Sequence, residues 1–267
     1  MRLFTGLALV VLVSLGSVGC TRQQPLAEEV SPVELNSLAQ KSIFFGHQSV
    51  GWNIIQGIEE TLKAQPTVTL TIRQAERIDA TQGPAFVHAE IGQNYDPLSK
   101  LQAFERLVRA GIGDRAQIAF FKFCYVDFDK NTDVDQLFTA YQQTMADLSQ
   151  AYPQTTFVYV TAPLMAPEQG AKALLKRLLG RNDEALANLK RHQFNERLRR
   201  AYAGNAALFD LAALEATYPD GTLCTVTVAN QTVPCLIVEY TDDGGHLNGL
   251  GRQVVAAQLL KFLAKLD

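Results

Sequence analysis

The sequence has few of the residues from which metal sites and nucleic acid interfaces are built. It contains four histidines and four cysteines among 267 residues, with neither a C-x-x-C pair nor histidines at the spacing of paired metal ligands. Long basic runs are also missing, and the formal net charge is −3. Because phosphate binding needs clustered lysine and arginine, we expect no nucleic acid partner. The scattered histidines and cysteines predict no metal ion, and the reaction expected below requires no cofactor.

The first twenty residues have the composition of an export signal. Arg2 is followed by an apolar stretch from Leu7 to Val13 and by small residues up to Cys20, an arrangement that resembles a bacterial lipoprotein signal. The resemblance implies a signal peptide over residues 1–19, a lipidated Cys20 with a tether over residues 20–35, and a folded domain over residues 36–267. It also implies a location in the bacterial cell envelope, either periplasmic or anchored at the outer membrane.

One position departs from this signal pattern. Ser17 stands where a leucine is usual, three positions before the cysteine. A membrane span is the alternative, but the uncharged run up to Cys20 barely reaches the ~20 residues that a crossing needs. We therefore expect the lipid anchor to be the chain's only contact with the membrane. Separately, we expect the protein to be a monomer.

Export changes how the other cysteines are interpreted, because disulfides persist in oxidising compartments. Cys224 and Cys235 flank two short β-prone pieces around Ala229-Asn230-Gln231, which predicts a hairpin with a disulfide across it. Cys124 lies inside an apolar strand-like run and is left over. We interpret it as a buried small hydrophobic residue, with a catalytic thiol as the alternative.

Strand-like and helical segments alternate along the chain. Hydrophobic residues make up 47% and charged residues 19% of the sequence, which is typical of a globular protein with a full core. The alternation predicts one domain, a three-layer α/β/α sandwich with a parallel sheet of about five strands. Strands are expected at residues 42–45, 67–73, 117–123, 156–161 and 207–210. Helices are expected at 32–40, 51–63, 97–110, 134–151, 172–202 with a break near 180–183, and 250–266, and a long loop at 75–94.

The stretch Gly46-His47-Gln48-Ser49-Val50-Gly51 joins the first predicted strand to the following helix. A serine at such a turn can be a nucleophile, since the glycines permit unusual backbone geometry and the helix start favours developing negative charge. The alternative is a strand-to-helix turn in which Ser49 is the N-cap. In a parallel sheet the reactive site lies at the carboxyl ends of the strands, where Ser49 falls.

A serine nucleophile needs a base, which is held in turn by a third group. Asp243 stands three residues before His246 in a glycine-containing loop ahead of the last helix, so its carboxylate could orient the imidazole. The alternative is a glycine turn in which Asn248 caps that helix.

Together the two segments resemble the SGNH, or GDSL-type, hydrolases, which carry the nucleophile after the first strand and a DxxH pair before the final helix of a flavodoxin-like fold. The resemblance implies Ser49 as nucleophile, His246 as general base and then acid, and Asp243 as the orienting carboxylate. It also implies that the Ser49 backbone amide contributes to an oxyanion hole. The chain departs from the family in its first block, which normally reads GDS and here reads GHQS, so His47 either supports the site or holds the turn by hydrogen bonding.

Two further blocks of the family match less closely. Gly92 corresponds to the glycine that donates an amide to the oxyanion. The asparagine block should follow the next strand, but residues 123–127 contain no asparagine. Asn94 is therefore a candidate for the side-chain donor, and Lys122 with Asp127 for an ion pair that lines the site.

The function expected from this resemblance is that of a serine esterase or acylhydrolase. The substrate is a small-molecule or carbohydrate ester, with O-acylated envelope or extracellular carbohydrate as one class. The alternatives are an O-acyltransferase with the same three residues, and a glycan-binding or envelope-assembly lipoprotein with little turnover. An α/β-hydrolase fits less well, because its GxSxG motif would require glycine where His47 stands.

Overall fold

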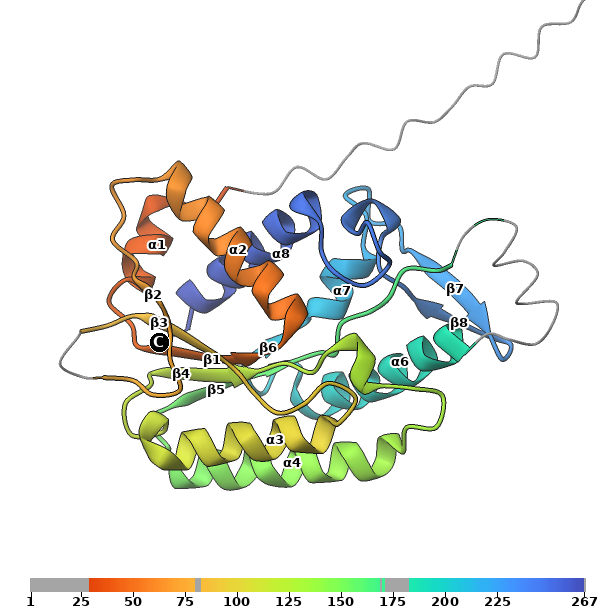
Figure 1. The fold of residues 1–267 in the computed structure, drawn as a ribbon, viewed down its shortest axis with the longest axis horizontal. Helices are drawn as coiled ribbons and strands as arrows, with labels where there is room; N and C mark the ends of the chain where they lie inside the picture. Colours follow the sequence, from red (N-terminus) through yellow and green to blue (C-terminus); the bar gives the residue numbers. More distant parts are fainter. Residues whose placement is uncertain (1–28, 80–82, 169, 171–182, 267) are drawn as a thin grey trace, which may run out of the picture.

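A computed structural model describes residues 29–79, 83–168, 170 and 183–266. Its centre is a six-stranded parallel sheet in the order β2-β3-β1-β4-β5-β6 (Figure 1). The strands are β1 (Ile43–His47), β2 (Ile72–Gln74), β3 (Phe86–Glu90), β4 (Ile118–Phe121), β5 (Thr156–Val160) and β6 (Leu208–Phe209). The predicted α/β class with a parallel sheet is confirmed.

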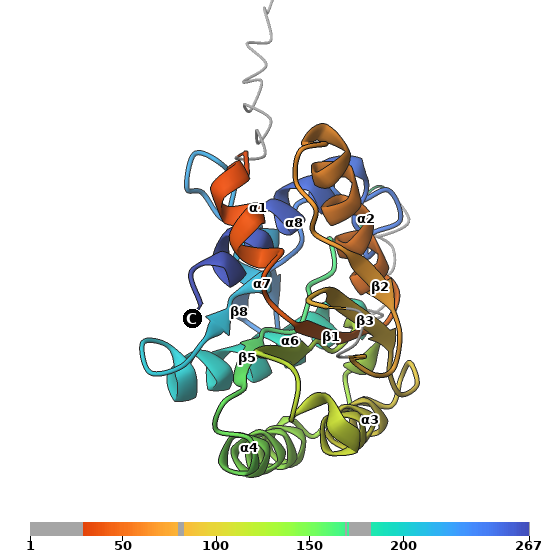
Figure 2. The ribbon, with the colours of Figure 1, turned by 90° about the vertical axis from the view of Figure 1, so that its left-hand side faces the viewer.

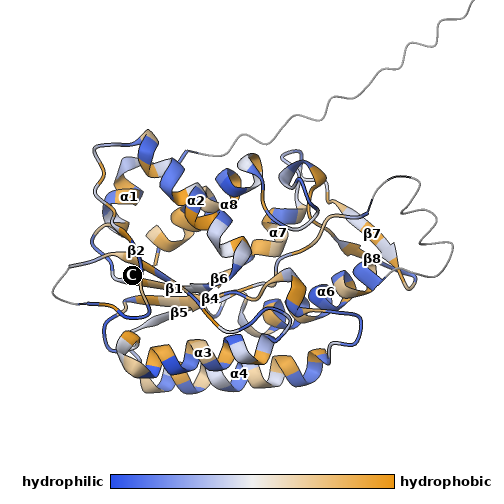
Figure 3. Ribbon diagram, viewed as in Figure 1, coloured by the Kyte–Doolittle hydropathy of each residue, from blue (hydrophilic) through white to orange (hydrophobic). Residues whose placement is uncertain are grey.

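Helices cover both faces of the sheet, as Figure 2 shows edge-on. One face carries α1 (Pro32–Leu38), α2 (Ser49–Ala64), α7 (Leu211–Ala216) and α8 (Gly249–Ala264), and the other carries α3 (Pro97–Leu107), α4 (Val134–Ala151) and α6 (Asp183–Tyr202). Successive residues of a strand point to opposite faces, so Phe44 belongs to the core under α3 and α4, whereas Phe45 belongs to the core under α2 and α8. In Figure 3 the central strands are largely hydrophobic, and the long helices carry both colours, as expected for elements with one buried face.

The sheet has one strand more than the sequence predicted, and the prediction was wrong at one edge. Residues 67–71 are not a strand, and β2 pairs with β3 only through residues 72–74. The strand β3 lies inside the segment predicted to be a long loop. Its sequence, Phe86-Val87-His88-Ala89-Glu90, has a histidine that suggests an exposed position, yet His88 is only 3% exposed because β3 lies between β1 and β2.

The predicted hairpin is present as β7 (Thr225–Val228) and β8 (Gln231–Pro234). The residues between them, Ala229 and Asn230, have φ of 48° and 61°, the left-handed conformation of a two-residue turn. The predicted disulfide is not formed: the sulfur atoms of Cys224 and Cys235 lie 2.7 Å apart, in a hydrogen-bond contact. Their hydrogen bond, with burial, raises the pKa of Cys235.

The N-terminal predictions fall largely outside the described residues. Cys20 and the signal peptide lie there, as does the predicted helix break near residues 180–183 except for its last residue, where α6 begins. The helix α1 starts at Pro32, inside the range predicted as tether, with Ser31 and Glu34 forming a capping box. None of the helices in the described ranges is long and apolar enough to cross a membrane.

Candidate active site

Three loops meet at the carboxyl edge of the sheet. The strand β1 pairs with β3 on one side and β4 on the other, so that Gly46 lies opposite both Ala89 and Phe121. The turn that contains Ser49 therefore lies between the loop after β3, which carries Gly92 and Asn94, and the loop after β4. This edge is where parallel α/β folds bind their ligands.

Ser49 is the first residue of α2 and not its cap. The N-cap is Gln48, whose backbone is extended, with φ −137°. The Gln48 side chain gives the helix no cap and instead donates to the carbonyls of Ile91 and Gly92, at 3.1 Å each. The partly exposed Ser49 hydroxyl has no hydrogen-bond partner within the described part of the chain. The first amides of a helix also lack partners within it, so Ser49 presents a free hydroxyl at an electropositive helix end.

The glycines around this turn allow close approach. A Cβ on Gly51 would lie 2.3 Å from the His47 ring, and one on Gly46 would lie 2.7 Å from Ile91. Gly92 has φ +59°, and a Cβ there would lie 2.5 Å from the Lys100 backbone. Only Gly92 needs the left-handed backbone that glycine adopts readily.

His47 is fully buried and holds the turn from inside. Its Nδ1 lies 3.0 Å from the Gln48 carbonyl, and its Nε2 lies 3.0 Å from Nδ1 of His88. A carbonyl only accepts, so Nδ1 of His47 carries the proton and its Nε2 accepts from His88. Burial lowers the pKa of His47 to about 3, which keeps this pair neutral. Of the two predicted roles for His47, these contacts match the one that holds the turn.

The Asp243 and His246 side chains are in contact. Nδ1 of His246 lies 2.6 Å from Oδ2 of Asp243, while Oδ1 accepts from the amides of Gly245 and His246. Burial would raise the pKa of Asp243, but these backbone and imidazole hydrogen bonds outweigh it and leave the pKa below its ordinary value. Asp243 is thus an ionised acceptor for the Nδ1 proton, and Nε2 of His246 is left as the basic nitrogen.

A hydrogen bond ties this loop to the helix that Ser49 begins. The amide of Leu247 donates to Oδ1 of Asn53 at 3.1 Å. Asn53 lies four residues after Ser49, on the same face of α2. Asn248 accepts from the amides of Leu250 and Gly251 and caps α8, so the predicted alternative of a helix cap coexists with the Asp243–His246 pair.

Tyr125 faces His246 and was not predicted from the sequence. Its hydroxyl lies 3.3 Å from Nδ1 and 3.4 Å from Nε2, and the two rings are perpendicular with centroids 5.4 Å apart. The backbone of Gly245 packs on the Tyr125 ring, where a Cβ would lie 2.6 Å away. Burial and the Asp243 charge raise the pKa of Tyr125 to about 12, so its hydroxyl stays protonated as a donor. The tyrosine follows an apolar strand end, where sequence alone cannot separate a core position from a site position.

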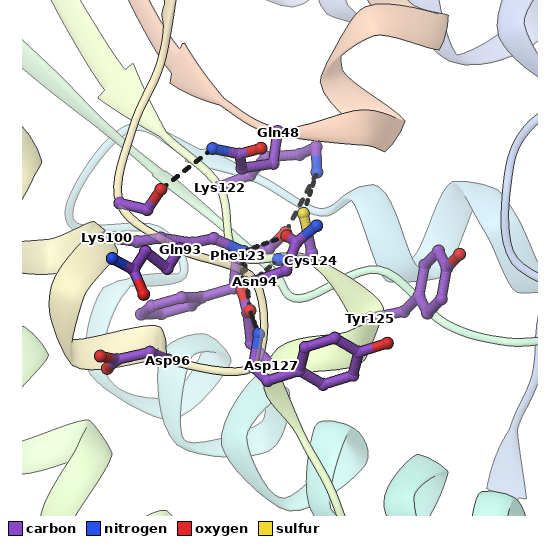
Figure 4. Close-up of polar contacts among 12 residues, drawn as sticks. Gln48, Gln93, Asn94, Asp96, Lys100, Lys122, Phe123, Cys124, Tyr125 and Asp127 are labelled. Carbon is purple, nitrogen blue, oxygen red and sulfur yellow. Dashed lines mark hydrogen bonds and ion pairs between the residues drawn. The ribbon is translucent and has the colours of Figure 1, made fainter.

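A buried ion pair organises the loops after β3 and β4 (Figure 4). Lys100 and Asp127 have fully buried side chains 2.6 Å apart. The Lys100 ammonium also donates to Oδ1 of Asn94 at 3.0 Å, and Asp127 accepts from the amides of Tyr95 and Cys124. Since lysine has only donors, the Asn94 amide must direct its oxygen to Lys100, which leaves its NH₂ group as a donor.

The predicted ion pair between Lys122 and Asp127 is wrong. Lys122 is buried and donates to the Phe123 carbonyl at 3.1 Å, while its ammonium lies 3.8 Å from the Cys124 sulfur. Asp127 already has Lys100, which approaches from α3. Burial lowers the pKa of Lys122 and raises that of nearby Glu215 to about 8. Cys124 is fully buried, as predicted for a small hydrophobic residue.

Among the described residues, histidine, cysteine and acidic side chains do not gather in groups of three or more that could hold a metal ion.

No family model and no curated protein sequence matches the chain. A solved protein from Streptococcus pneumonia, provisionally described as a platelet activating factor, is 15% identical over 87% of this chain and 90% of its own, with a TM-score of 0.51. The acetyl xylan esterase AlAXEase is 17% identical over 83% and 98%, with a TM-score of 0.45. A protein from Desulfitobacterium hafniense, provisionally described as lipolytic and of the G-D-S-L family, is 8% identical over 85% and 99%, with a TM-score of 0.44. The first similarity shows a shared fold, and the chain has the flavodoxin-like α/β/α fold that its resemblance to SGNH hydrolases predicted.

Proposed function

We propose that the chain is a serine esterase of the SGNH type, with Ser49 as nucleophile, His246 as base and Asp243 as orienting carboxylate. The observation that carries this proposal is the 2.6 Å contact between Asp243 and Nδ1 of His246, in a loop bonded to Asn53 on the helix that Ser49 begins. The free Ser49 hydroxyl at the sheet edge supports it. Solved proteins with related folds include an acetyl xylan esterase.

In the proposed reaction, the Ser49 oxygen attacks the ester carbonyl carbon and its proton passes to Nε2 of His246. The carbonyl oxygen becomes an oxyanion, the carbon–oxygen bond to the alcohol breaks, and His246 gives the proton to the departing alcohol. Water then attacks the acyl-enzyme with His246 again as base, which releases the acid and restores Ser49. Asp243 stays ionised throughout and stabilises the imidazolium.

The proposed oxyanion donors are the backbone amides of Ser49 and Gly92 and the NH₂ group of Asn94. Donors aimed at developing charge contribute roughly 3 to 4 kcal/mol each where they have been measured. The contact from Lys100 supports Asn94 in this role, because it fixes which end of the amide is available. The asparagine missing after β4 favours the alternative of a binding protein without turnover, and an available Asn94 amide argues against that alternative.

The proposed substrates are esters of carbohydrates or small alcohols. An O-acetyl group on a neutral glycan fits an exported protein, and lipidation at Cys20 would hold the enzyme at the envelope surface. Both the lipid anchor and the envelope location are proposals that follow from the predicted signal. Labelling of the expressed protein with a radioactive fatty acid, lost in Cys20→Ala, tests them.

The experiment that tests the function is hydrolysis of 4-nitrophenyl acetate by the wild type beside Ser49→Ala and His246→Ala. We expect kcat to fall by at least ~10³-fold in each variant. Ser149→Ala on α4 and His192→Ala on α6 are matched controls, since both side chains are partly buried and lie outside the site. Full activity in Ser49→Ala would refute the proposal, whereas a slowly hydrolysed acyl-enzyme on Ser49 would identify an acyltransferase.

A further inference from the structure

A cavity of about 250 Å³ opens between the starts of α3 and α4, beside the loops of the candidate site. Its lining includes Tyr95, Leu98, Val126 and the buried carboxylate of Asp127. It is smaller than the roughly 300 to 1,000 Å³ of pockets that enclose drug-sized ligands. Its size suits a single ring with polar substituents.

Tyr95 is presented to solvent at this cavity from an anchored stretch of backbone. It is 78% exposed, and the neighbouring Leu98 is 36% exposed. Its backbone has φ +66°, which is uncommon for a bulky residue. Its amide donates to Oδ1 of Asp127, the acceptor that also binds Lys100. The ring is therefore exposed while the backbone that carries it is anchored in the interior.

The rim also carries polar and acidic side chains, Asp129, Thr132, Asp133 and Gln136. Oδ1 of Asp129 accepts from the Asn131 amide and the Thr132 hydroxyl, and Oδ1 of Asp133 accepts from the Gln136 amide. The second oxygen of each carboxylate has no partner within the described ranges. An aromatic face beside carboxylates suits a ligand with one apolar face and several hydroxyl groups, because carboxylates accept hydrogen bonds from hydroxyls and repel anions.

We propose that Tyr95 and this cavity form a subsite for one neutral sugar ring of an acylated oligosaccharide whose ester lies at Ser49. The C–H face of the pyranose packs on the Tyr95 ring, and its hydroxyls donate to Asp129 and Asp133. This inference rests on the proposed esterase function and specifies its substrate class as neutral glycans longer than one sugar.

The link between subsite and ester site is the loop after β3. Tyr95 directly follows Asn94, the proposed oxyanion donor, and Gly92 lies two residues before Asn94. Within the buried pair, Lys100 holds the Asn94 side chain (Figure 4). Asp127 holds the Tyr95 backbone amide. One anchored loop thus presents a polar donor and an aromatic platform on consecutive residues.

The test compares two substrates, 4-nitrophenyl acetate and partially acetylated xylotetraose, in the wild type, Tyr95→Ala and Tyr95→Phe. We expect Tyr95→Ala to lower kcat/KM for the tetrasaccharide roughly tenfold more than for the small ester, mainly through KM. Tyr95→Phe keeps the ring and should keep the wild-type ratio within about twofold. Val33→Ala is the matched control, because Val33 is also 78% exposed but lies on α1.

The outcomes separate this inference from the function on which it rests. If the wild type hydrolyses 4-nitrophenyl acetate but not the acetylated tetrasaccharide, or if Tyr95→Ala leaves the ratio of the two substrates unchanged, the subsite is overturned and the esterase stands. If Tyr95→Phe loses as much as Tyr95→Ala, stacking on the ring is overturned. Inactivity of the wild type on both substrates overturns the esterase and the subsite together.

Discussion

The pair formed by Lys100 and Asp127 allows a prediction that separates stability from activity. Both side chains are fully buried and 2.6 Å apart, and removing one partner of such a pair leaves an uncompensated charge in the interior. In Asp127→Ala, the Lys100 ammonium keeps only the Asn94 oxygen as acceptor, and the amides of Tyr95 and Cys124 lose theirs. We expect a loss of about 3 to 5 kcal/mol in the free energy of unfolding.

For a chain of this size, that loss corresponds to a fall in Tm of roughly 6 to 20 °C. Lys100→Met should cost less, nearer 3 kcal/mol, because the carboxylate of Asp127 still accepts from two backbone amides. Scanning calorimetry and urea unfolding followed by circular dichroism measure both variants.

The double variant Lys100→Met with Asp127→Leu replaces the pair by apolar side chains of similar volume. Buried pairs replaced in this way are often neutral or stabilising, so we expect most of the lost stability to return. Activity on 4-nitrophenyl acetate should stay at least ~10-fold below the wild type, because nothing then orients the Asn94 amide or anchors the Tyr95 backbone. Wild-type activity in the double variant would refute the positioning role, and single variants within about 1 kcal/mol of the wild type would refute the energetic argument.

Three further predictions concern single features of the fold. Tyr125→Phe removes the hydroxyl that faces His246 and should lower kcat/KM for 4-nitrophenyl acetate roughly three- to tenfold; a kcat/KM equal to that of the wild type would contradict this. Oxidation should join Cys224 and Cys235, lower the mass by two hydrogens and stabilise the fold by about 3 kcal/mol, and two alkylated thiols after air oxidation would count against it. Burial raises the pKa of Glu215 to about 8 from 4.5. Between these pH values the native state therefore keeps a proton that the unfolded chain has released. The free energy of unfolding should fall by up to about 5 kcal/mol as the pH rises from 4.5 to about 8. Urea unfolding at both pH values should show this fall in the free energy of unfolding in the wild type but not in Glu215→Gln.

The fold could be predicted because its determinants are local. Apolar runs such as Ile118–Phe121 and amphipathic segments such as Val134–Ala151 carry the periods of buried strands and surface helices. The prediction failed at β2 and β3 because strand pairing there is not a local property. Residues 67–71 are β-prone, but strand formation also needs a partner, and β3 takes the place beside β1.

The site could be predicted only in part. Asp243 and His246 are three residues apart, so their contact is a property of one loop. The partners of Asp127 and His246 are not local: Lys100 comes from α3, and Tyr125 lies 121 residues before the histidine. We predicted Lys122 as the ion-pair partner of Asp127 because it lies nearby along the chain. In the structure Lys122 donates to the Phe123 carbonyl, and Asp127 pairs with Lys100.

The irregular first block can be understood from how its side chains are used. In GHQS, the buried His47 is held by His88 of β3, and Gln48 donates to the carbonyls of Ile91 and Gly92 just after that strand. Both residues that distinguish this block from GDS thus bond to β3 or its loop. That loop also depends on Lys100 and Asp127 from its other side. The loop that carries Gly92 and Asn94 is therefore fixed from two directions. This supports the proposal that these two residues act as donors to the oxyanion although the usual asparagine is missing.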